Sequence, residues 1–162
     1  MVLVLAALPR EVRPLPRKLR GAAASFEWLP TDEIKVAVTG LGRKAAEAAA
    51  EKLLHRYPVH MVISTGFAGA LTSEMEAGQL FASDTVNAPD NSPLRTDKTL
   101  LERALTIGVG DLRLAALVSV PSLVSDAASR KALHVAHEAQ AEATRLHGPL
   151  CAGGSPALSS ER

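Results

Sequence analysis

The stretch VHMVISTGFAGALTSEMEAGQL, residues 59–80, carries most of the information about the fold. It opens with an apolar run from Val59 to Ile63, which is typical of a strand buried on both faces. The run passes directly into Ser64-Thr65-Gly66-Phe67-Ala68-Gly69, where small residues leave the main chain accessible. A buried strand with such an end indicates a place where another molecule approaches the backbone.

The composition predicts one globular domain. The chain has 162 residues, of which 47% are hydrophobic and 22% charged, and this length is enough to bury a sizeable core. Its formal net charge of +1 favours neither a nucleic-acid partner nor an acidic one, and we expect no nucleic-acid binding. We read the basic residues of one early segment as a solvated helix face; they are Arg13, Arg17, Lys18 and Arg20.

The first apolar run and the single cysteine indicate where in the cell the protein is found. MVLVLAAL, residues 1–8, is too short to cross a bilayer and lacks a basic leader region, so we read it as a buried first strand. Cys151 is the only cysteine, which excludes an internal disulfide and fits a reducing compartment. We therefore expect a cytoplasmic protein that does not bind membranes.

Apolar runs alternate with helix-forming segments along the chain. The predicted strands are Val2–Ala7, Ser25–Leu29, Ile34–Thr39, Val59–Thr65, Gln79–Val86 and Leu112–Val120. The predicted helices are a short one from Pro9, and longer ones at Arg43–Tyr57, Thr99–Ile107 and Asp126 to about His147. Asn87–Asp97, rich in Pro, Asn and Asp, is a predicted loop. This order predicts an α/β domain over residues 1–147, a mixed β-sheet flanked by helices, with an irregular tail at 148–162.

Unusual residues follow three of the predicted strands. They lie at Ala7–Glu11, Thr39–Gly42 and Ser64–Gly69. Ligands of α/β sheets bind beyond the carboxyl ends of the strands, so these segments predict the walls of one pocket.

Two simpler interpretations of the glycines stay open at this point. The segment IKVAVTGLGRKAA, residues 34–46, contains G-x-G-x-x-A between a strand and a helix, as in dinucleotide sites. The acidic residue expected after the next strand is missing, because that strand ends in Ser64-Thr65. Alternatively, the glycines serve only tight turns and close packing.

Read in order, four segments resemble the nucleoside phosphorylase/nucleosidase superfamily. They are AALPREV (6–12), VAVTGLGRKAAEAAAEKLL (36–54), VISTGFAGAL (62–71) and AGQLFASDTV (77–86). The resemblance covers roughly residues 1–133 and is closest to the 5′-methylthioadenosine/S-adenosylhomocysteine nucleosidases. It implies a nucleoside phosphorylase-like fold, C-terminally shortened, and a hydrolase that cleaves the N-glycosidic bond of a 5′-modified adenosine, as in methionine salvage.

The resemblance also implies roles for single residues. Glu11 falls on the position whose carboxylate orients and deprotonates the attacking water. Gly66, Ala68 and Gly69 match the segment whose backbone lines the sugar and the base. Phe67 departs from the family, which places a small hydroxyl residue there, and its ring would stack on the ligand or partly fill the pocket.

Further along, the match to the family weakens. Leu123 and Val124 fall on the positions that sandwich the purine. Glu142 is either a displaced ribose-binding glutamate or a solvated residue of a polar helix, and the family's purine-side aspartate has no counterpart. We therefore expect this shortened chain to be a poor catalyst.

Two alternative functions remain open, and we expect neither a metal site nor a cofactor. Arg10 and Arg43 keep a phosphate-dependent phosphorylase open, and the other alternative is a non-catalytic nucleoside-binding remnant. His134, His137 and Glu138 share a helix face without an established metal-ligand spacing, so we expect no metal site. We expect no cofactor, a small-molecule nucleoside as the partner, and a homo-oligomer, most simply a dimer.

Overall fold

Four strands from the N-terminal half of the chain form one sheet. In the computed structural model, residues 1–13, 27–28, 34–88, 91–107, 112–122 and 124–143 are described. From edge to edge, the strands of this sheet are β2 (Glu27–Trp28), β3 (Ile34–Val38), β1 (Val2–Ala6) and β4 (Met61–Ser64). Strands β3, β1 and β4 run parallel, and β2 pairs antiparallel with β3 at the edge.

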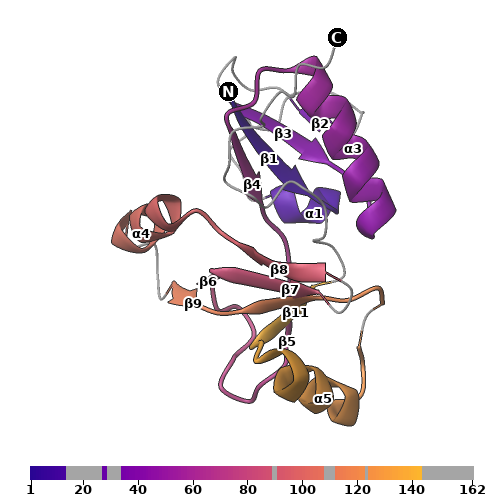
Figure 1. Cartoon of the computed structure of the whole chain (residues 1–162), viewed down its shortest axis with the longest axis vertical. Coiled ribbons are helices and arrows are strands. Elements are labelled where there is room, and N and C mark those ends of the chain that lie inside the picture. The colour runs from indigo at the N-terminus through magenta and orange to yellow at the C-terminus, as the bar shows by residue number, and fades with distance from the viewer. Residues whose placement is uncertain (14–26, 29–33, 89–90, 108–111, 123, 144–162) are drawn as a thin grey trace.

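Buried residues of β1 and β3 belong to two apolar clusters, which fits the largely apolar sequences of these two strands, whereas Ile63 of β4 is 44% exposed. Helix α3 (Arg43–Arg56) packs one cluster of buried residues against the sheet, made of Leu3, Leu5, Ala37, Ala50 and Leu53. A second cluster includes Val12 of the short helix α1 (Pro9–Val12), with Ala6, Val36 and Val38. The carboxyl ends of β1, β3 and β4 and the helix α1 point toward the second half of the molecule (Figure 1).

Five strands form the second sheet. In order they are β5 (Gly69–Ala70), β11 (Ala141–Ala143), β10 (Leu117–Ser119), β7 (Thr85–Ala88) and β8 (Asn91–Arg95). Helix α5 (Ala127–His137) packs Leu133 against a cluster that contains Leu71, Val118 and Val120. Helix α4 (Lys98–Ile107) and the two-stranded pair β6 (Phe81–Ala82) and β9 (Arg113–Leu114) lie at one side of this half (Figure 1).

The predicted class, a mixed α/β fold with helices against mixed sheets, is confirmed. Strands β1, β3 and β4 and helix α3 also lie where the sequence predicts them. The predicted strands Gln79–Val86 and Leu112–Val120 are each divided in two, β6 with β7 and β9 with β10. The predicted tail at 148–162 lies outside the described residues.

Two predicted elements are wrong. Helix α5 ends at His137, and Glu138 adopts a left-handed conformation with φ of 49° before the chain enters β11. The predicted loop over Asn87–Asp97 contains the end of β7 and the strand β8. Pro93 is tolerated in β8 because this strand lies at the edge of its sheet, where a missing N–H costs no ladder hydrogen bond.

None of the helices in the described parts of the chain is both long enough and apolar enough to cross a membrane.

Candidate functional site

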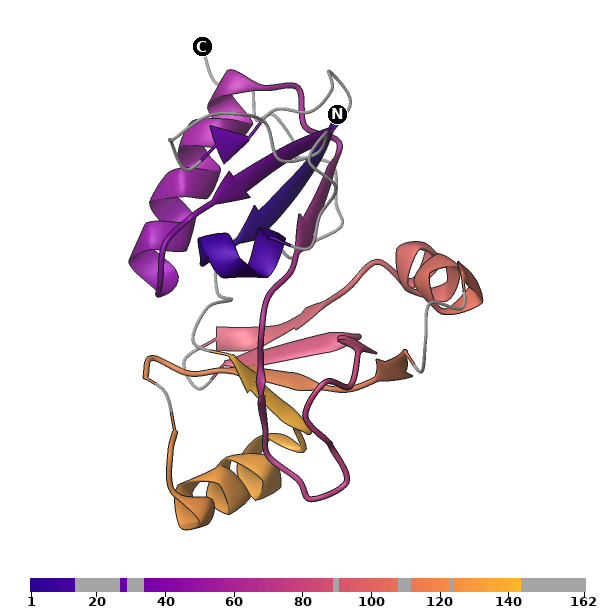
Figure 2. The same ribbon diagram turned by 180° about the vertical axis from the view of Figure 1, so that it is seen from behind.

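The segment that follows β4 connects the two sheets. Thr65 extends the pairing of β4 by one residue, since its N–H donates to the Leu5 carbonyl at 2.9 Å. Gly66, Phe67 and Ala68 then cross to β5, where Gly69 pairs with β11. Figure 2 shows this crossing from behind, as a single extended segment that runs from one sheet into the other. The stretch singled out in the sequence is therefore the connection between the two halves.

Glu11 is hydrogen-bonded to the crossing segment from the side of the first sheet. The backbone N–H groups of Ala7 and Leu8 donate to Glu11 Oε2 at 3.0 and 2.9 Å. The N–H of Phe67 donates to Oε1 of the same carboxylate at 3.2 Å. Pro9 has no N–H and starts α1 at once, so Glu11 lies in the first turn, where its side chain can reach back to the end of β1. One carboxylate thus joins the ends of β1 and β4.

Glu142 lies at the other end of the crossing segment. It belongs to β11, between Val118 of β10 and Gly69 of β5, and is 3% exposed. Its Oε2 is buried and has no hydrogen-bond partner among the described residues. A Cβ atom on Gly69 would lie 2.9 Å from Glu142 Oε1 and 3.1 Å from Glu142 Cγ, so a side chain at position 69 would require the Glu142 side chain to shift. The interpretation of Glu142 as a solvated residue of a polar helix is wrong.

The surroundings of Glu142 favour its neutral form. Burial raises the pKa of the Glu142 carboxyl above its ordinary value, while the Val124 backbone amide and the positive charge of Arg130 lower it by less. Buried polar atoms are nearly always hydrogen-bonded, so a carboxyl oxygen without a partner among the described residues is an exception to that rule.

Phe67 projects from the middle of the crossing segment. Its side chain is 62% exposed, so it is not a core residue. The Arg10 guanidinium lies over the ring, 5.6 Å from the centroid. Phe67 and Arg10 therefore form a cation–π contact directly beside the carboxylate of Glu11.

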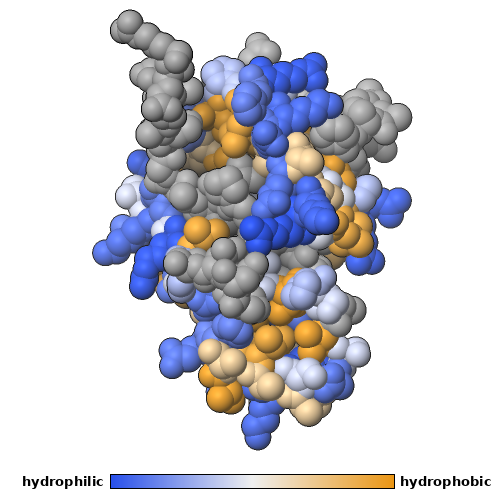
Figure 3. All heavy atoms as spheres, turned by 45° about the vertical axis from the view of Figure 1, so that its right-hand side comes forward, coloured by the Kyte–Doolittle hydropathy of each residue, from blue (hydrophilic) through white to orange (hydrophobic). Residues whose placement is uncertain are grey.

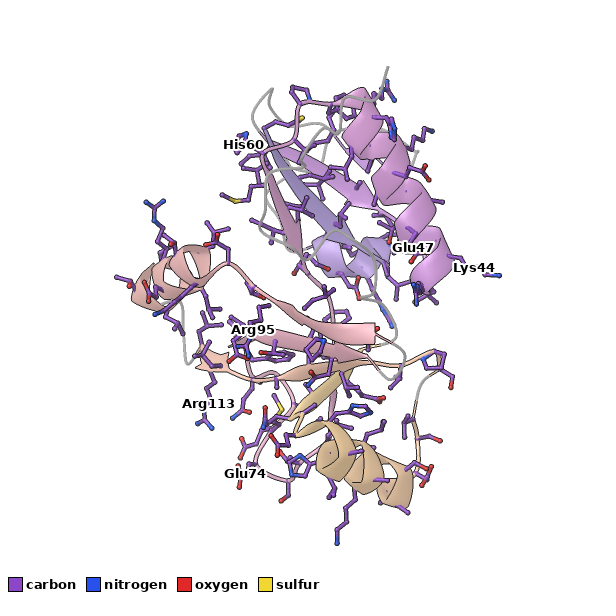
Figure 4. The ribbon with its side chains drawn as sticks, viewed as in Figure 1. Lys44, Glu47, His60, Glu74, Arg95 and Arg113 are labelled. Atoms are coloured by element: carbon purple, nitrogen blue, oxygen red, sulfur yellow. The ribbon has the colours of Figure 1, made fainter. Side chains whose placement is uncertain are left out.

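The third strand end predicted from the sequence completes this edge. The N–H of Thr39 donates to the Ala6 carbonyl at 2.8 Å, so β3 and β1 end side by side. Gly40 and Gly42 have φ of 88° and 86°, which explains both glycines by backbone conformation alone. Arg43 begins α3, and its Nε donates to Glu47 Oε1 at 2.7 Å. Figure 4 shows Glu47 and Lys44 on the first turns of α3, with Lys44 pointing outward.

An apolar hollow lies on the Glu142 side. It has a volume of about 430 Å³, and its lining comes from the segment after β10, including Val124, and from α5, including Leu133. Figure 3 shows apolar residues gathered over this lower half of the molecule. Leu123, the other residue predicted beside the purine, lies outside the described residues.

In the structure, most of the predicted site residues either belong to the crossing segment, residues 66–69, or lie next to it. Glu11 contacts Phe67, Glu142 contacts Gly69, and the Val124 amide lies beside Glu142. Across the described ranges no group of histidine, cysteine, aspartate and glutamate side chains could hold a metal ion. No sequence pattern indicates the contact of Arg10 with Phe67 or the charge of Arg130 near Glu142, because both depend on the tertiary fold.

Comparison with known proteins places the chain in a family. The family model described as the phosphorylase superfamily matches residues 2–162. The chain belongs to the phosphorylase superfamily. The superfamily resemblance of the four sequence segments is thereby confirmed, and the dinucleotide-binding interpretation loses its basis. No curated protein matches the chain significantly.

Solved structures share the fold of this phosphorylase-superfamily chain at low sequence identity. A mutant Helicobacter pylori methylthioadenosine/S-adenosylhomocysteine nucleosidase with 5′-methylthioadenosine in its active site has a TM-score of 0.76 and 16% identity, over 90% of this chain and 75% of the other. The native futalosine hydrolase of Helicobacter pylori gives 0.77 and 15%, over 90% and 74%. The nucleosidase of Campylobacter jejuni gives 0.77 and 19%, over 91% and 75%. At these identities the likeness establishes the fold.

Proposed function

We propose that this phosphorylase-superfamily chain is a purine nucleosidase, which hydrolyses the N-glycosidic bond of a 5′-modified adenosine. The observation that carries the proposal is the position of Glu11, whose carboxylate accepts hydrogen bonds from the ends of two strands, at Leu8 and at Phe67. A carboxylate fixed in this way beside accessible backbone is suited to orienting a water molecule and accepting its proton. Similar structures named as nucleosidases and as futalosine hydrolase support this class of reaction.

The reaction balances with the groups available. The water oxygen forms a bond to C1′ of the ribose while the bond from C1′ to the purine nitrogen breaks, and its electron pair leaves with the purine. One proton of the water passes to Glu11, which later releases it to solvent, the remaining O–H becomes the new hydroxyl group on C1′, and the purine takes up a proton from solvent as it leaves. The transition state resembles an oxocarbenium ion, so the negative charge of Glu11 also stabilises the ribose ring.

Other residues are proposed to position the nucleoside. Glu142 would accept hydrogen bonds from the ribose hydroxyls, which would satisfy its orphaned oxygen. The backbone of Gly66, Ala68 and Gly69 would lie along the sugar and base. Val124, with Leu123, would contact the purine. The reaction as written needs no metal and no cofactor.

Hydrolysis is favoured over phosphorolysis by the hydrogen bonds of Glu11. Phosphate is typically bound by backbone N–H groups and by arginines. Here the N–H groups of Ala7, Leu8 and Phe67 donate to a carboxylate of the protein itself, whose negative charge would repel phosphate. Of the two arginines that favour a phosphorylase, Arg43 is paired with Glu47.

The substitution Glu11→Gln tests the proposal. Glutamine keeps the shape of the side chain but is a far weaker base, so we expect the rate of base release to fall by about 10²-fold or more. Base release from 5′-methylthioadenosine is followed by absorbance, and thermal melting and nucleoside binding show whether the variant is folded. Glu47→Gln, an exposed carboxylate on α3, is the matched control. Turnover by Glu11→Gln at the wild-type rate would refute the assigned role.

A further inference from the structure

Strand β4 has backbone groups that face away from its sheet. It lies at the edge of the first sheet (Figure 1) and, among the described residues, pairs with β1 alone. The N–H of Thr65 donates to the Leu5 carbonyl, so by the alternation of a strand the N–H and C=O groups of Ile63 also face β1. Those of Val62 and Ser64 face outward. They form a short row of donors and acceptors to which another strand can bind.

The side chains of this edge are uncharged and mostly apolar. The sequence of β4 is Met-Val-Ile-Ser, and Ile63 is 44% exposed. Sheet edges in soluble proteins are usually protected from further pairing by charged residues or by proline. Edge strand β8 contains Pro93 and Arg95, and edge strand β2 contains Glu27. The remaining edge strand of the two larger sheets, β5, has only two residues. Within the described ranges, β4 is therefore the longest unprotected edge of these sheets.

We propose that β4 pairs antiparallel with β4 of a second copy of this chain, about a two-fold axis at Ile63. In this register Val62 of one copy and Ser64 of the other form a hydrogen-bonded pair, and the axis repeats that pair. The outward N–H and C=O groups of both residues are then bonded. The two Ile63 side chains lie directly opposite each other, at the closer spacing of a non-hydrogen-bonded pair, and cover each other. The two four-stranded sheets become one continuous sheet.

The absence of charge on β4 favours a second copy as the occupant. A two-fold axis brings the same residues of both chains together, so a charge near the axis would meet a like charge. No residue of β4 is charged, and the pair at the axis is aliphatic. The next pair on the same face, Met61 opposite Thr65, is uncharged as well. The edge therefore complements itself both in hydrogen bonding and in charge.

Disulfide trapping in the full chain tests this register. Ile63→Cys and Ser64→Cys are each combined with Cys151→Ser, so that each protein has a single thiol. Both positions are exposed, which makes Ser64→Cys the matched control. At the axis the two Cα atoms of residue 63 would be about 4.5 Å apart, which a disulfide can span. The two residues at position 64 would be diagonal neighbours, about 7–8 Å apart, which is too far.

Under mild oxidation we expect Ile63→Cys to form the linked dimer about tenfold faster than Ser64→Cys, because only residue 63 meets its own copy within disulfide range. Equal rates for the two variants, or faster linkage through position 64, would overturn the proposed pairing.

Light scattering over a range of protein concentrations measures the association itself. The wild type should reach twice the monomer mass, and so should Val135→Lys, the matched control at an exposed apolar residue of α5. Ile63→Lys should weaken association by about tenfold or more, since it places two like charges opposite each other. Thermal melting shows whether each variant is folded, and the cysteine pair decides if Ile63→Lys is not. A wild type that stays monomeric, or a folded Ile63→Lys that associates as the wild type does, would overturn the inference.

Discussion

Glu142 is the residue whose surroundings depart most from those expected of its type. Glutamate is rarely fully buried without a partner, yet this side chain is 3% exposed and one of its oxygens has no hydrogen bond among the described residues. Such a cost persists where function needs it, and a ribose hydroxyl is the partner we propose. The same residue therefore links stability to ligand binding.

The raised pKa of Glu142 makes the free energy of unfolding depend on pH in a defined direction. The folded state holds the proton to a higher pH than the unfolded state does, so the free energy of unfolding falls as pH rises from the ordinary pKa of 4.5 through the folded pKa. Glu142→Gln removes this titration. We expect its melting temperature to fall less than that of the wild type between about pH 5 and about pH 8.

Nucleoside binding provides the second readout for Glu142→Gln. Replacing the carboxyl group should weaken binding by about tenfold, because an amide offers one acceptor oxygen to the ribose hydroxyls where the carboxyl group offers two. If the variant melted with the same pH dependence as the wild type, the burial described for this carboxyl would be wrong. Unchanged nucleoside affinity would remove its proposed contact with the ribose.

At the scale of elements, the short antiparallel contact of β5 with β11 fixes where Glu142 lies. Gly69 faces Glu142 across this contact, and an added Cβ atom would come within 2.9 Å of Oε1. That distance is shorter than any ordinary contact, so either the strand or the carboxyl must move. A side chain at position 69 would therefore have to displace the Glu142 side chain.

Gly69→Ala is expected to destabilise the protein by about 1–3 kcal/mol, the usual cost of overpacking. The double variant Gly69→Ala with Glu142→Ala should recover part of that loss, because the colliding carboxyl is gone. Chemical denaturation of the wild type, both single variants and the double variant gives the coupling energy. Additive effects of the two substitutions would show that the two residues do not meet.

The same elements show what the sequence can and cannot predict. Strands β1, β3 and β4 and helix α3 follow from patterns that are uniform along each segment. The segment AQAEAT, residues 139–144, consists largely of helix formers, and its strand arises from pairing with β10 and β5. Tertiary pairing overrides local propensity there, so both the end of α5 and the burial of Glu142 were beyond prediction.

At the scale of the whole molecule, the candidate site lies on the connection between two sheets. Glu11 binds this connection from the first sheet, and Glu142 contacts it from the second. The sequence predicted that three strand ends would meet, and β1, β3 and β4 do end at one edge. The part of the site in the second sheet could not be predicted, because it is formed by Gly69 and Glu142, which lie far apart in the chain.

The identity of the sugar product tests the central claim most directly. The chain is incubated with 5′-methylthioadenosine in buffer that contains inorganic phosphate, and the products are identified by mass spectrometry. The account predicts free adenine and the free 5-methylthio sugar, at a rate that does not change with phosphate concentration. A sugar 1-phosphate formed in proportion to phosphate would contradict it, since phosphate would then be the nucleophile in place of the water beside Glu11.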